Sequence, residues 1–443
     1  MELIVAEISR YIIVIFFAFY TYFSYRVFTK KTEEGKNSLW KGQRTLTVLI
    51  TLLCGFILLL EKKDIKYLVL LVLELAFYFF FVKIYQVFYK GLSKLVLNNM
   101  MICMMVGFIM MGRLDYDYAI RQLLMASIAM AVCLLVPLFI ERIQIWEKLG
   151  WYYAMAGLAF LALVFVIGVE KYGAKNWIAF GGFAIQPSEF VKIIYVFFIA
   201  SLLAKFRDFR HVVLITILAA AHVIILVVEK DLGAALIYFV TYLAMLYTAT
   251  MQVGYLLAGL AGGTGAALVA YKLFSHVRTR VIAWQDPWSH INNEGYQITR
   301  SLFAIGTGGL FGMGLGQGLP ESVPVVESDF IFSAIAEEMG VIFAICLILV
   351  YISCYIMFVN IAMKMNKLFY KLTAFGLSVV FIFQTFMCIG GACKFIPSTG
   401  VTLPLISYGG SSIITTILIF SIIQGMYVLN GREEVAEHGE KNE

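Results

Sequence analysis

The sequence predicts an all-α, polytopic integral membrane protein with about 13 transmembrane helices and one long extracellular loop. Of its 443 residues, 61% are hydrophobic and 14% are charged, and the mean hydropathy is +0.88. Soluble domains are about a quarter charged, so this composition argues against an ordinary cytosolic enzyme. Apolar stretches of about 20 residues, the length that crosses a bilayer, recur along the chain with short polar breaks.

Each predicted span is one of these apolar stretches, bounded by charged or turn-forming residues. The stretch 45–60 is short and 330–358 is long, so we expect these helices to be tilted, thinned or broken. The first stretch lacks a preceding basic region and a following cleavage site, which indicates a retained anchor. The stretches are residues 11–28, 45–60, 66–88, 95–111, 119–139, 151–169, 188–204, 211–228, 232–250, 252–274, 330–358, 368–392 and 403–428.

The lysines and arginines of the connections predict the orientation, because cytoplasmic loops carry more of them. If the C-terminus is inside, the inner connections hold 17 such residues and the outer connections hold 10. The bias predicts an outer N-terminus and a cytoplasmic C-terminus. The inner set is Lys30, Lys31, Lys36, Lys41, Arg44, Lys90, Lys94, Arg142, Lys148, Lys205, Arg207, Arg210, Lys364, Lys367, Lys371, Arg432 and Lys441. The outer set is Arg10, Lys62, Lys63, Lys66, Arg113, Arg121, Lys171, Lys175, Lys230 and Lys394.

Three polar segments interrupt the apolar pattern. Residues 29–44 are expected to form an inner loop, and residues 431–443 an acidic cytoplasmic tail without fixed structure. Residues 275–329 form the only long connection, which is rich in glycine and is expected to face outward. Long connections in compact folds are commonly functional, so this loop is a candidate site.

Composition also limits the partners. The net charge of +6 is mild for this length, and no basic tract alternates with aromatic residues, so nucleic acid is not an expected partner. Seven cysteines lie in or beside apolar stretches without a CxxC motif and are interpreted as reduced packing residues. The five histidines form no HExxH motif or cluster typical of a metal site.

The first candidate site follows Pro187, which suits the first position of a helix. Glu189 then lies in the first turn, and Lys192 lies three residues further on the same face, where the two can pair. One interpretation is a capped helix with a stabilising ion pair; the other is a polar cavity that opens outward. Lys175 and Trp177 precede this helix, and the aromatic residue is expected at the membrane interface.

Further candidates lie in the outer connections. Asp231, at a span boundary, is either a helix cap or a site residue. Arg278 and Arg280 suit phosphate groups, because the planar guanidinium donates paired hydrogen bonds. Gln297 lies in a segment, residues 295–316, whose many glycines permit close backbone approach to a ligand, although a structural hairpin or re-entrant turn is the commoner explanation. Asp329 is either a helix cap or a partly dehydrated carboxylate suited to accept a proton.

Two acids lie deeper in the span after Asp329. Glu337 and Glu338 must be paired or protonated there, because an isolated charge in the bilayer is costly. Residues 400–412 open the last span with small residues that suit close helix packing, and Ser411 and Ser412 are candidate polar groups of a cavity.

The ordered series of these motifs resembles the shape, elongation, division and sporulation family, the RodA/FtsW/SpoVE proteins. The series is GAKNWI, QPSEFVK, KDLG, an Arg-Thr-Arg with DPW and GYQI, GTGGLFGMGLG, SDFIF with AEEMG, and LPLISYGGSS. The resemblance covers roughly residues 95–428. It implies a ten-helix glycosyltransferase core over residues 89–430, preceded by about three extra transmembrane helices in residues 1–88.

The resemblance implies a peptidoglycan glycosyltransferase in the bacterial cytoplasmic membrane that polymerises lipid II into glycan strands at the outer face, in elongation, division or sporulation. It places the catalytic role on Asp329 and substrate binding on Glu189, Lys192, Asp231, Arg278, Arg280, Lys175 and Gln297. It implies a divalent cation, Mg²⁺ or Mn²⁺, no organic cofactor, and no assigned metal ligands. The expected partners are lipid II, undecaprenyl-pyrophosphate-linked glycan and a class B penicillin-binding protein.

The sequence departs from the common family pattern at three positions. Asn176 stands where many members carry arginine, so Lys175 is the residue left to supply that charge. Val325 and Glu327 replace the glutamate and histidine often found before the catalytic aspartate. Two other classes of function use the same features: a flippase that moves lipid II without forming bonds, and a scaffold that only recruits a transpeptidase.

Overall fold

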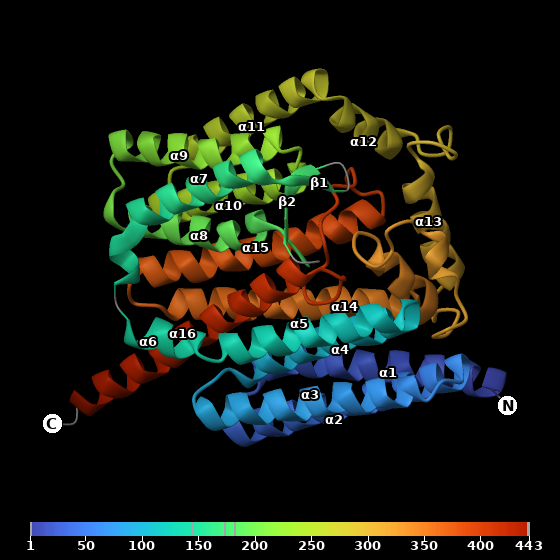
Figure 1. Ribbon diagram of the computed structural model, residues 1–443. Helices are drawn as coiled ribbons and strands as arrows, with labels where there is room; N and C mark the ends of the chain where they lie inside the picture. Colours follow the sequence, from blue (N-terminus) through green and yellow to red (C-terminus); the bar gives the residue numbers. More distant parts are fainter. Residues whose placement is uncertain (1, 144, 172–173, 181–182, 441–443) are drawn as a thin grey trace. The chain divides into compact units, whose positions relative to one another are not determined.

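The computed structural model describes residues 2–143, 145–171, 174–180 and 183–440 of the chain (Figure 1). Within these residues, 13 helices are long and apolar enough to cross a membrane, which confirms the predicted all-α, multi-pass architecture. Gly173 of the GAKNWI motif and Lys441 of the charge count lie outside the described residues.

The chain divides into two compact units, each built from separate stretches of sequence. The first unit comprises Met1–Leu134, Arg280–Ile356 and Thr385–Ile417, and the second comprises Leu135–Thr279, Met357–Gln384 and Leu418–Glu443. Helices α12 (Ser275–Gln285), α14 (Ile331–Lys364), α15 (Leu368–Ala392) and α16 (Gly410–Glu440) contribute residues to both units.

The first unit contains the N-terminal helices and most of the long connection. Its other elements are α1 (Glu2–Thr29), α2 (Glu33–Lys62), α3 (Lys66–Phe88), α4 (Lys94–Leu114), α5 (Tyr116–Cys133), α13 (Tyr296–Gly308) and the short helix η2 (Pro320–Ser322). The segment 275–329, expected to be a loop, therefore contains two helices and a helical turn.

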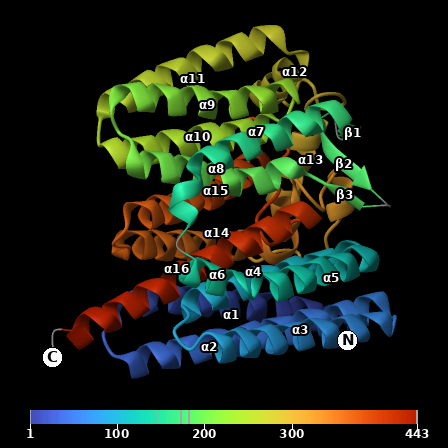
Figure 2. The same cartoon turned by 60° about the vertical axis from the view of Figure 1, so that its left-hand side comes forward.

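The second unit combines helices with a small antiparallel sheet beside α7 and α8 (Figure 2). Its elements are α6 (Val136–Arg142), η1 (Trp146–Leu149), α7 (Gly150–Ile167), β1 (Val169–Lys171), β2 (Ala174–Phe180), β3 (Phe183–Ile185), α8 (Pro187–Lys205), α9 (Phe209–Val228), α10 (Leu232–Thr250) and α11 (Val253–Leu273). In the sheet, Val169 pairs with Trp177 and Ile178 pairs with Ile185. The apolar pattern of the sequence did not predict this sheet.

Side-chain caps fix where several of the helices begin. Thr32, Ser93, Asp115 and Asp208 each accept a hydrogen bond from a backbone N–H of the helix that follows. Such caps satisfy donors that have no partner within the helix, which favours a helix start at that residue.

Three predicted boundaries are wrong. Residues 29–44 are mostly helical, because Thr32 caps α2 and the polar side chain of Gln43 is buried and donates to Ser24 Oγ at 2.9 Å. The last span begins at Gly410 instead of residue 403, since residues 403–409 form a turn. The tail, expected to lack fixed structure, is helical as far as residue 440, because α16 continues to Glu440.

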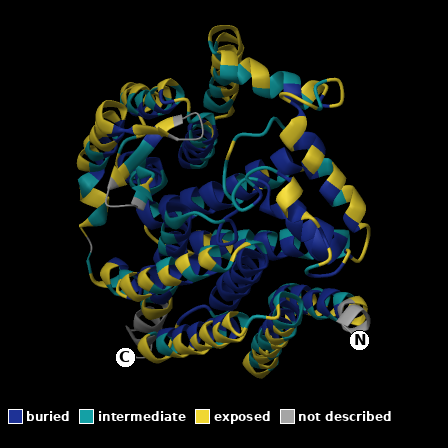
Figure 3. Ribbon diagram, turned by 45° about the vertical axis from the view of Figure 1, so that its right-hand side comes forward, coloured by how far each residue is buried: buried dark blue, intermediate teal, exposed yellow. Residues whose placement is uncertain are grey.

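Helix α4 forms the centre of the first unit. All of its residues from Leu95 to Arg113 are buried. The N-terminal helices instead bury one face and expose the other, as Figure 3 shows by the exposed residues along them. Since exposed apolar side chains of a spanning helix face lipid, α1 to α3 form one edge of this unit.

Helix α14 is broken at Gly340, where φ is +87° and ψ is 167°, which confirms that the long predicted span is not one regular helix. The break frees backbone groups that residues 309–314 satisfy. A free group of this kind within a bilayer would cost several kcal/mol. The four bonds run from Val341 N to Gly309 O (2.9 Å), Ile342 N to Leu310 O (3.2 Å), Met313 N to Glu337 O (2.9 Å) and Gly314 N to Glu338 O (2.9 Å).

The glycines of this segment permit the close contact. A Cβ on Gly312 would lie 2.2 Å from Glu338 O, and a Cβ on Gly308 would lie 2.1 Å from Ala336 O. These distances are impossible for a side chain, so the glycines serve packing of the backbone against α14. For Gly308 and Gly312, the close approach that a glycine permits is therefore to the backbone of α14.

We predict that Gly312→Ala strongly lowers the thermal stability of the detergent-solubilised protein. Gly312 has φ of +79° in addition to the 2.2 Å approach, and a strained φ alone costs about 1–3 kcal/mol. Gly306→Ala is the matched control, because a Cβ there meets nothing within 4 Å. Equal melting temperatures for the two variants would contradict the packing role.

Candidate functional site

Asp329 lies in an irregular loop immediately before α14, held against a second loop at residues 397–409. Tyr408 N donates to Glu327 O at 2.7 Å, and the Ser407 hydroxyl donates to Ser328 O. Ser328 Oγ in turn donates to Asp329 Oδ1 at 3.0 Å. The aspartate is therefore fixed by a chain of hydrogen bonds between the two loops. It does not cap α14, which begins at Ile331.

Both loops contain strained residues. Val325 has φ of +55° and Leu405 has φ of +68°, although neither residue is a glycine. The amides of Ser328 and Asp329 both donate to Val325 O at 3.2 Å, which closes the turn that carries the aspartate. Strain of this kind persists only when surrounding contacts hold it, and it is concentrated at functional sites.

Arg280 and Asp329 face the same glycine. A Cβ on Gly400 would lie 3.4 Å from Asp329 Oδ2 and 3.7 Å from Arg280 Nη2, and Gly400 has φ of +71°. Arg280 Nη1 also donates to Ser398 O at 3.2 Å. The first unit thus brings together two of the predicted site residues, a carboxylate and a guanidinium.

Burial raises the pKa of Asp329 above the ordinary aspartate value. The hydrogen bond from Ser328 and the charge of Arg280 act in the opposite direction, and the charge of Glu327 adds to the rise. A carboxylate with a raised pKa is a stronger proton acceptor than an exposed aspartate while remaining able to ionise. Asp329 therefore has the environment of a general base.

The second unit contains the predicted Glu189–Lys192 pair. Lys192 Nζ lies 2.7 Å from Glu189 Oε2 and 2.6 Å from Gln384 Oε1, and the lysine is only 3% exposed. Pro187 is the first residue of α8, as its lack of an N–H favours. The ion pair is confirmed, and both acceptors hold the lysine in one position.

Asp231 connects the sheet with two helices of the same unit. Its Oδ1 accepts from Ala234 N at 3.0 Å and caps α10. Its Oδ2 accepts from Asn176 Nδ2 at 2.6 Å, Gln186 Nε2 at 3.1 Å and Ser188 Oγ at 3.4 Å. The cap interpretation is confirmed, and Asn176, one of the positions that depart from the family pattern, is one of the donors.

Glu229, two residues before Asp231, was not predicted as a site residue, yet it is a deeply buried carboxyl group. It is 1% exposed, and neither carboxyl oxygen has a hydrogen-bond partner among the described residues. Burial raises the pKa of Glu229 to about 8, and the neighbouring charge of Asp231 adds to the rise. The group is therefore mostly protonated at neutral pH.

The other predicted site residues are exposed. Lys175 lies on β2 with its Nζ 5.7 Å from the centre of the Phe165 ring. Arg278, in the second unit, donates to Lys272 O at 3.1 Å, and Gln297 lies on α13 in the first unit. Their exposure leaves them accessible to a ligand, and none of the described contacts assigns them a role.

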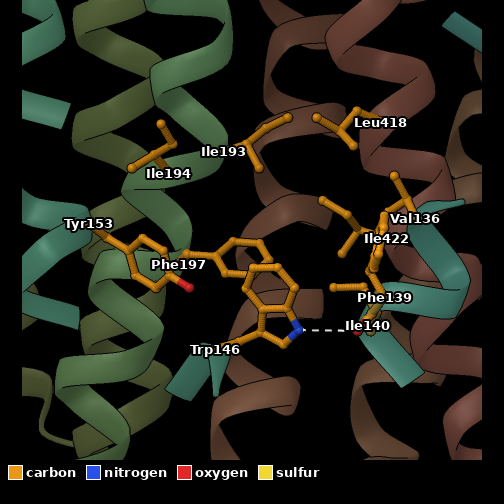
Figure 4. A pocket seen from close by; sticks show the side chains of 10 residues that line it. All are labelled: Val136, Phe139, Ile140, Trp146, Tyr153, Ile193, Ile194, Phe197, Leu418 and Ile422. Carbon is orange, nitrogen blue, oxygen red and sulfur yellow. Dashed lines mark hydrogen bonds between the residues drawn. The ribbon is translucent and has the colours of Figure 1, made fainter. Parts of the chain in front are cut away.

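The second unit also contains an apolar pocket of about 240 Å³ (Figure 4). Figure 4 shows Trp146 and Phe197 side by side within it, with Trp146 Nε1 donating to Phe139 O at 3.3 Å. No charged side chain lines the pocket. Apart from Tyr153 and Trp146, its lining side chains are hydrocarbon, which suits apolar contacts.

No group of three or more histidine, cysteine or acidic residues that could hold a metal ion is found within the described part of the chain. Mg²⁺ is commonly bound by one or two carboxylates together with substrate phosphates. Asp329 and Glu327 would supply two carboxylates at most. The described residues do not form a complete metal site on their own.

Several contacts of the site had weak signals in the sequence. Gln384 is a strongly polar residue in a mostly apolar helix, a pattern that marks functional or paired groups in membranes. The aromatic run around Trp177, followed by Gly181-Gly182 and a second aromatic residue, is typical of a hairpin. The pairing of Ser407 with Ser328 spans 79 residues and has no local signal.

Comparison with known proteins identifies the family. The family model for FtsW, RodA and SpoVE, described as "Cell cycle protein", matches residues 91–428. The chain belongs to the FtsW/RodA/SpoVE family. Helices α1 to α3 precede the matched region.

Members of the family differ in their assigned roles. The chain is 37% identical over 347 residues to the peptidoglycan glycosyltransferase RodA of Mycobacterium tuberculosis, covering 72% of this chain and 74% of that protein. It is 32% identical to stage V sporulation protein E of Bacillus subtilis, covering 70% and 86%. A solved peptidoglycan synthase complex, which coordinates polymerization and crosslinking, contains a chain 25% identical with a TM-score of 0.64, covering 77% and 98%.

We predict that Glu229→Gln becomes increasingly more stable than the wild type as the pH rises from 5 to 8. The unfolded chain releases the glutamate proton near the ordinary pKa of 4.5, whereas the folded protein keeps it up to a pKa of about 8. The free energy of unfolding of the wild type therefore falls between pH 5 and 8, and it levels off above pH 8. Melting temperatures of both proteins across the interval test this, and a constant difference would contradict it.

Proposed function

We propose that this protein is a peptidoglycan glycosyltransferase that polymerises lipid II at the outer face of the bacterial cytoplasmic membrane, with Asp329 as general base. The observation that carries the proposal is Asp329 itself, a carboxylate of raised pKa held opposite Arg280 at Gly400. Membership of a family with peptidoglycan glycosyltransferases among its members supports the reaction class.

The reaction joins two amphiphilic molecules. Asp329 accepts the proton of the acceptor sugar 4-hydroxyl, and that oxygen attacks the anomeric carbon of the lipid-linked donor. The bond from the anomeric carbon to the pyrophosphate breaks, so the configuration inverts from α to β. Undecaprenyl pyrophosphate leaves with the electron pair. Arg280 and Arg278 stabilise its growing negative charge, since guanidinium groups bind phosphate oxygens in pairs.

The polar residues of the second unit are proposed to bind the substrate. Lys192, fixed by Glu189 and Gln384, is a cation suited to a phosphate. Lys175 and Asp231 are further contacts in the proposal, as is Gln297 of the first unit. Mg²⁺ or Mn²⁺ would be held together with the pyrophosphate and would offset its negative charge.

The orientation and the partner belong to the same proposal. The lysine and arginine bias supports an outer N-terminus and a cytoplasmic C-terminus. The partner is proposed to be a class B penicillin-binding protein, because the similar synthase complex couples polymerization to crosslinking. A crosslinking enzyme beside the polymerase would act on the strand as it emerges.

We predict that purified wild-type protein in detergent forms glycan chains from lipid II, and that Asp329→Asn lowers this activity by about 100-fold or more. Asparagine has the size of aspartate but accepts no proton at neutral pH. Chain length on gels and the rate of lipid II consumption are the measurements. Adding a chelator to the same assay tests the requirement for a divalent cation.

Asp117→Asn is the control for this variant, because Asp117 is exposed at the start of α5. It should retain wild-type activity, and the melting temperature of Asp329→Asn should show that it is folded. Wild-type rates in Asp329→Asn would reject the general base. A wild type that forms no polymer in detergent, with or without the partner, would favour a flippase or a scaffold.

A further inference from the structure

The N-terminal helices α1 and α2 lie outside the family region, yet their ends contact the glycine-rich segment 309–318 of that region. Arg10 Nη1, near the start of α1, donates to Gly312 O at 2.9 Å. The adjacent Tyr11 ring lies 5.1 Å from the ring of Phe311. Both contacts belong to the first unit.

Glu61, near the end of α2, contacts the same segment at a second point. A Cβ on Gly316 would lie 1.7 Å from Glu61 Oε2, so the carboxylate occupies the space that any side chain at this position would need. Gly316 has φ of +84°, which also favours glycine. The electrostatic neighbours of Glu61 include Arg113, which lies on α4.

Arg113 extends this contact toward α14. Its Nε donates to Glu338 Oε1 at 2.8 Å, and its Nη2 donates to Gly318 O at 3.1 Å. Glu338 Oε1 also accepts from Gly318 N at 3.3 Å. These buried charged hydrogen bonds connect the glycine-rich segment with the part of α14 before Gly340.

The segment and α14 depend on each other through the break at Gly340. The four backbone bonds that residues 309–314 exchange with residues 337–342 replace those that the helix loses. A shift of the segment would leave these groups without partners, at several kcal/mol each in a bilayer. We therefore expect residues 331–339 of α14 to move together with the segment. Asp329 lies two residues before α14 begins and would be displaced with them.

Helix α1 also contacts the part of α14 that follows the break at Gly340. The Phe17 and Phe343 rings stack with centres 4.0 Å apart, and Tyr25 OH donates to Leu349 O at 3.0 Å. One helix therefore contacts α14 directly after the break and contacts the segment that bridges the break. This is the geometry of a clamp across a broken helix.

We propose that α1 and α2 are a built-in clamp on the glycine-rich segment, in which Arg10 and Glu61 are positioning residues that hold the start of α14 and thereby Asp329 in its working position. Arg10 and Glu61 precede the family region, and this role explains why α1 and α2 pack against it. It rests on the polymerase activity proposed above. The two positioning residues act through α14 and do not contact the substrate.

The first test measures polymerisation kinetics of Arg10→Ala and Glu61→Gln in the full-length protein. A displacement near 1 Å can cost about 100-fold in rate, and the loss of one of two contacts should move Asp329 by less. We therefore expect kcat to fall about tenfold in each variant, with KM for lipid II changed less than about twofold. Arg10→Lys should restore much of the loss, since lysine can still donate to Gly312 O. Arg26→Ala and Glu33→Gln are matched controls on the same two helices, exposed and away from the segment, and should keep the wild-type kcat.

The second test is hydrogen exchange of Glu61→Gln and Arg10→Lys against the wild type, which needs no activity. We expect faster exchange in peptides that cover residues 309–319 and 324–330 for Glu61→Gln, and near-wild-type exchange for Arg10→Lys. An unchanged kcat in folded Arg10→Ala and Glu61→Gln would overturn the proposal. So would faster exchange confined to residues 1–88. If the wild type forms no polymer but exchange changes as expected, the proposed function fails and the clamp stands.

Discussion

The packing of two irregular loops against each other determines the environment of Asp329, and the proposed chemistry depends on it. The loop before α14 and the loop at residues 397–409 share hydrogen bonds through Tyr408, Ser407 and Ser328. Burial in this contact raises the pKa of the carboxyl group, and a Cβ on Gly400 would lie 3.4 Å from its Oδ2. The same geometry brings Arg280 toward the aspartate, which keeps the rise in its pKa limited.

Each unit contains its own set of buried or partly buried charges. In the first unit, Arg113 and Glu338 neutralise each other beside the glycine-rich segment. In the second, Lys192 is paired with Glu189, and Glu229 stays protonated because burial raises its pKa. Buried charges cost several kcal/mol unless they are paired or neutralised, so these groups are strong constraints on the fold. A multi-pass protein that only needed to fold would have little reason to contain them.

Hydrophobicity predicted most helices because the bilayer imposes their length. The spans 66–88, 232–250 and 368–392 have the predicted ends, and the family motifs were sufficient to single out Asp329. Helix α2 was underestimated because Gln43 and its neighbours are polar yet pair with side chains of other helices. The small sheet was missed because its strands are short and lie next to long apolar runs.

The surroundings of Asp329 could not be predicted for a different reason. Its neighbours include residues 280 and 400, and such distant pairings leave no periodic pattern in a single sequence. The function of the glycines was equally hidden, since close approach to a ligand and close approach to α14 require the same residue type. The two explanations differ only in what lies against the glycine backbone, and for Gly308 and Gly312 it is α14.

The most direct test of the account is carbodiimide labelling of Asp329, followed across pH by mass spectrometry with and without lipid II. The reagent modifies protonated carboxyl groups. We expect a labelling midpoint above the ordinary aspartate pKa of about 3.9, and protection of Asp329 by lipid II while exposed Asp117 is unaffected. A midpoint at or below the ordinary value, or labelling that lipid II leaves unchanged, would contradict it.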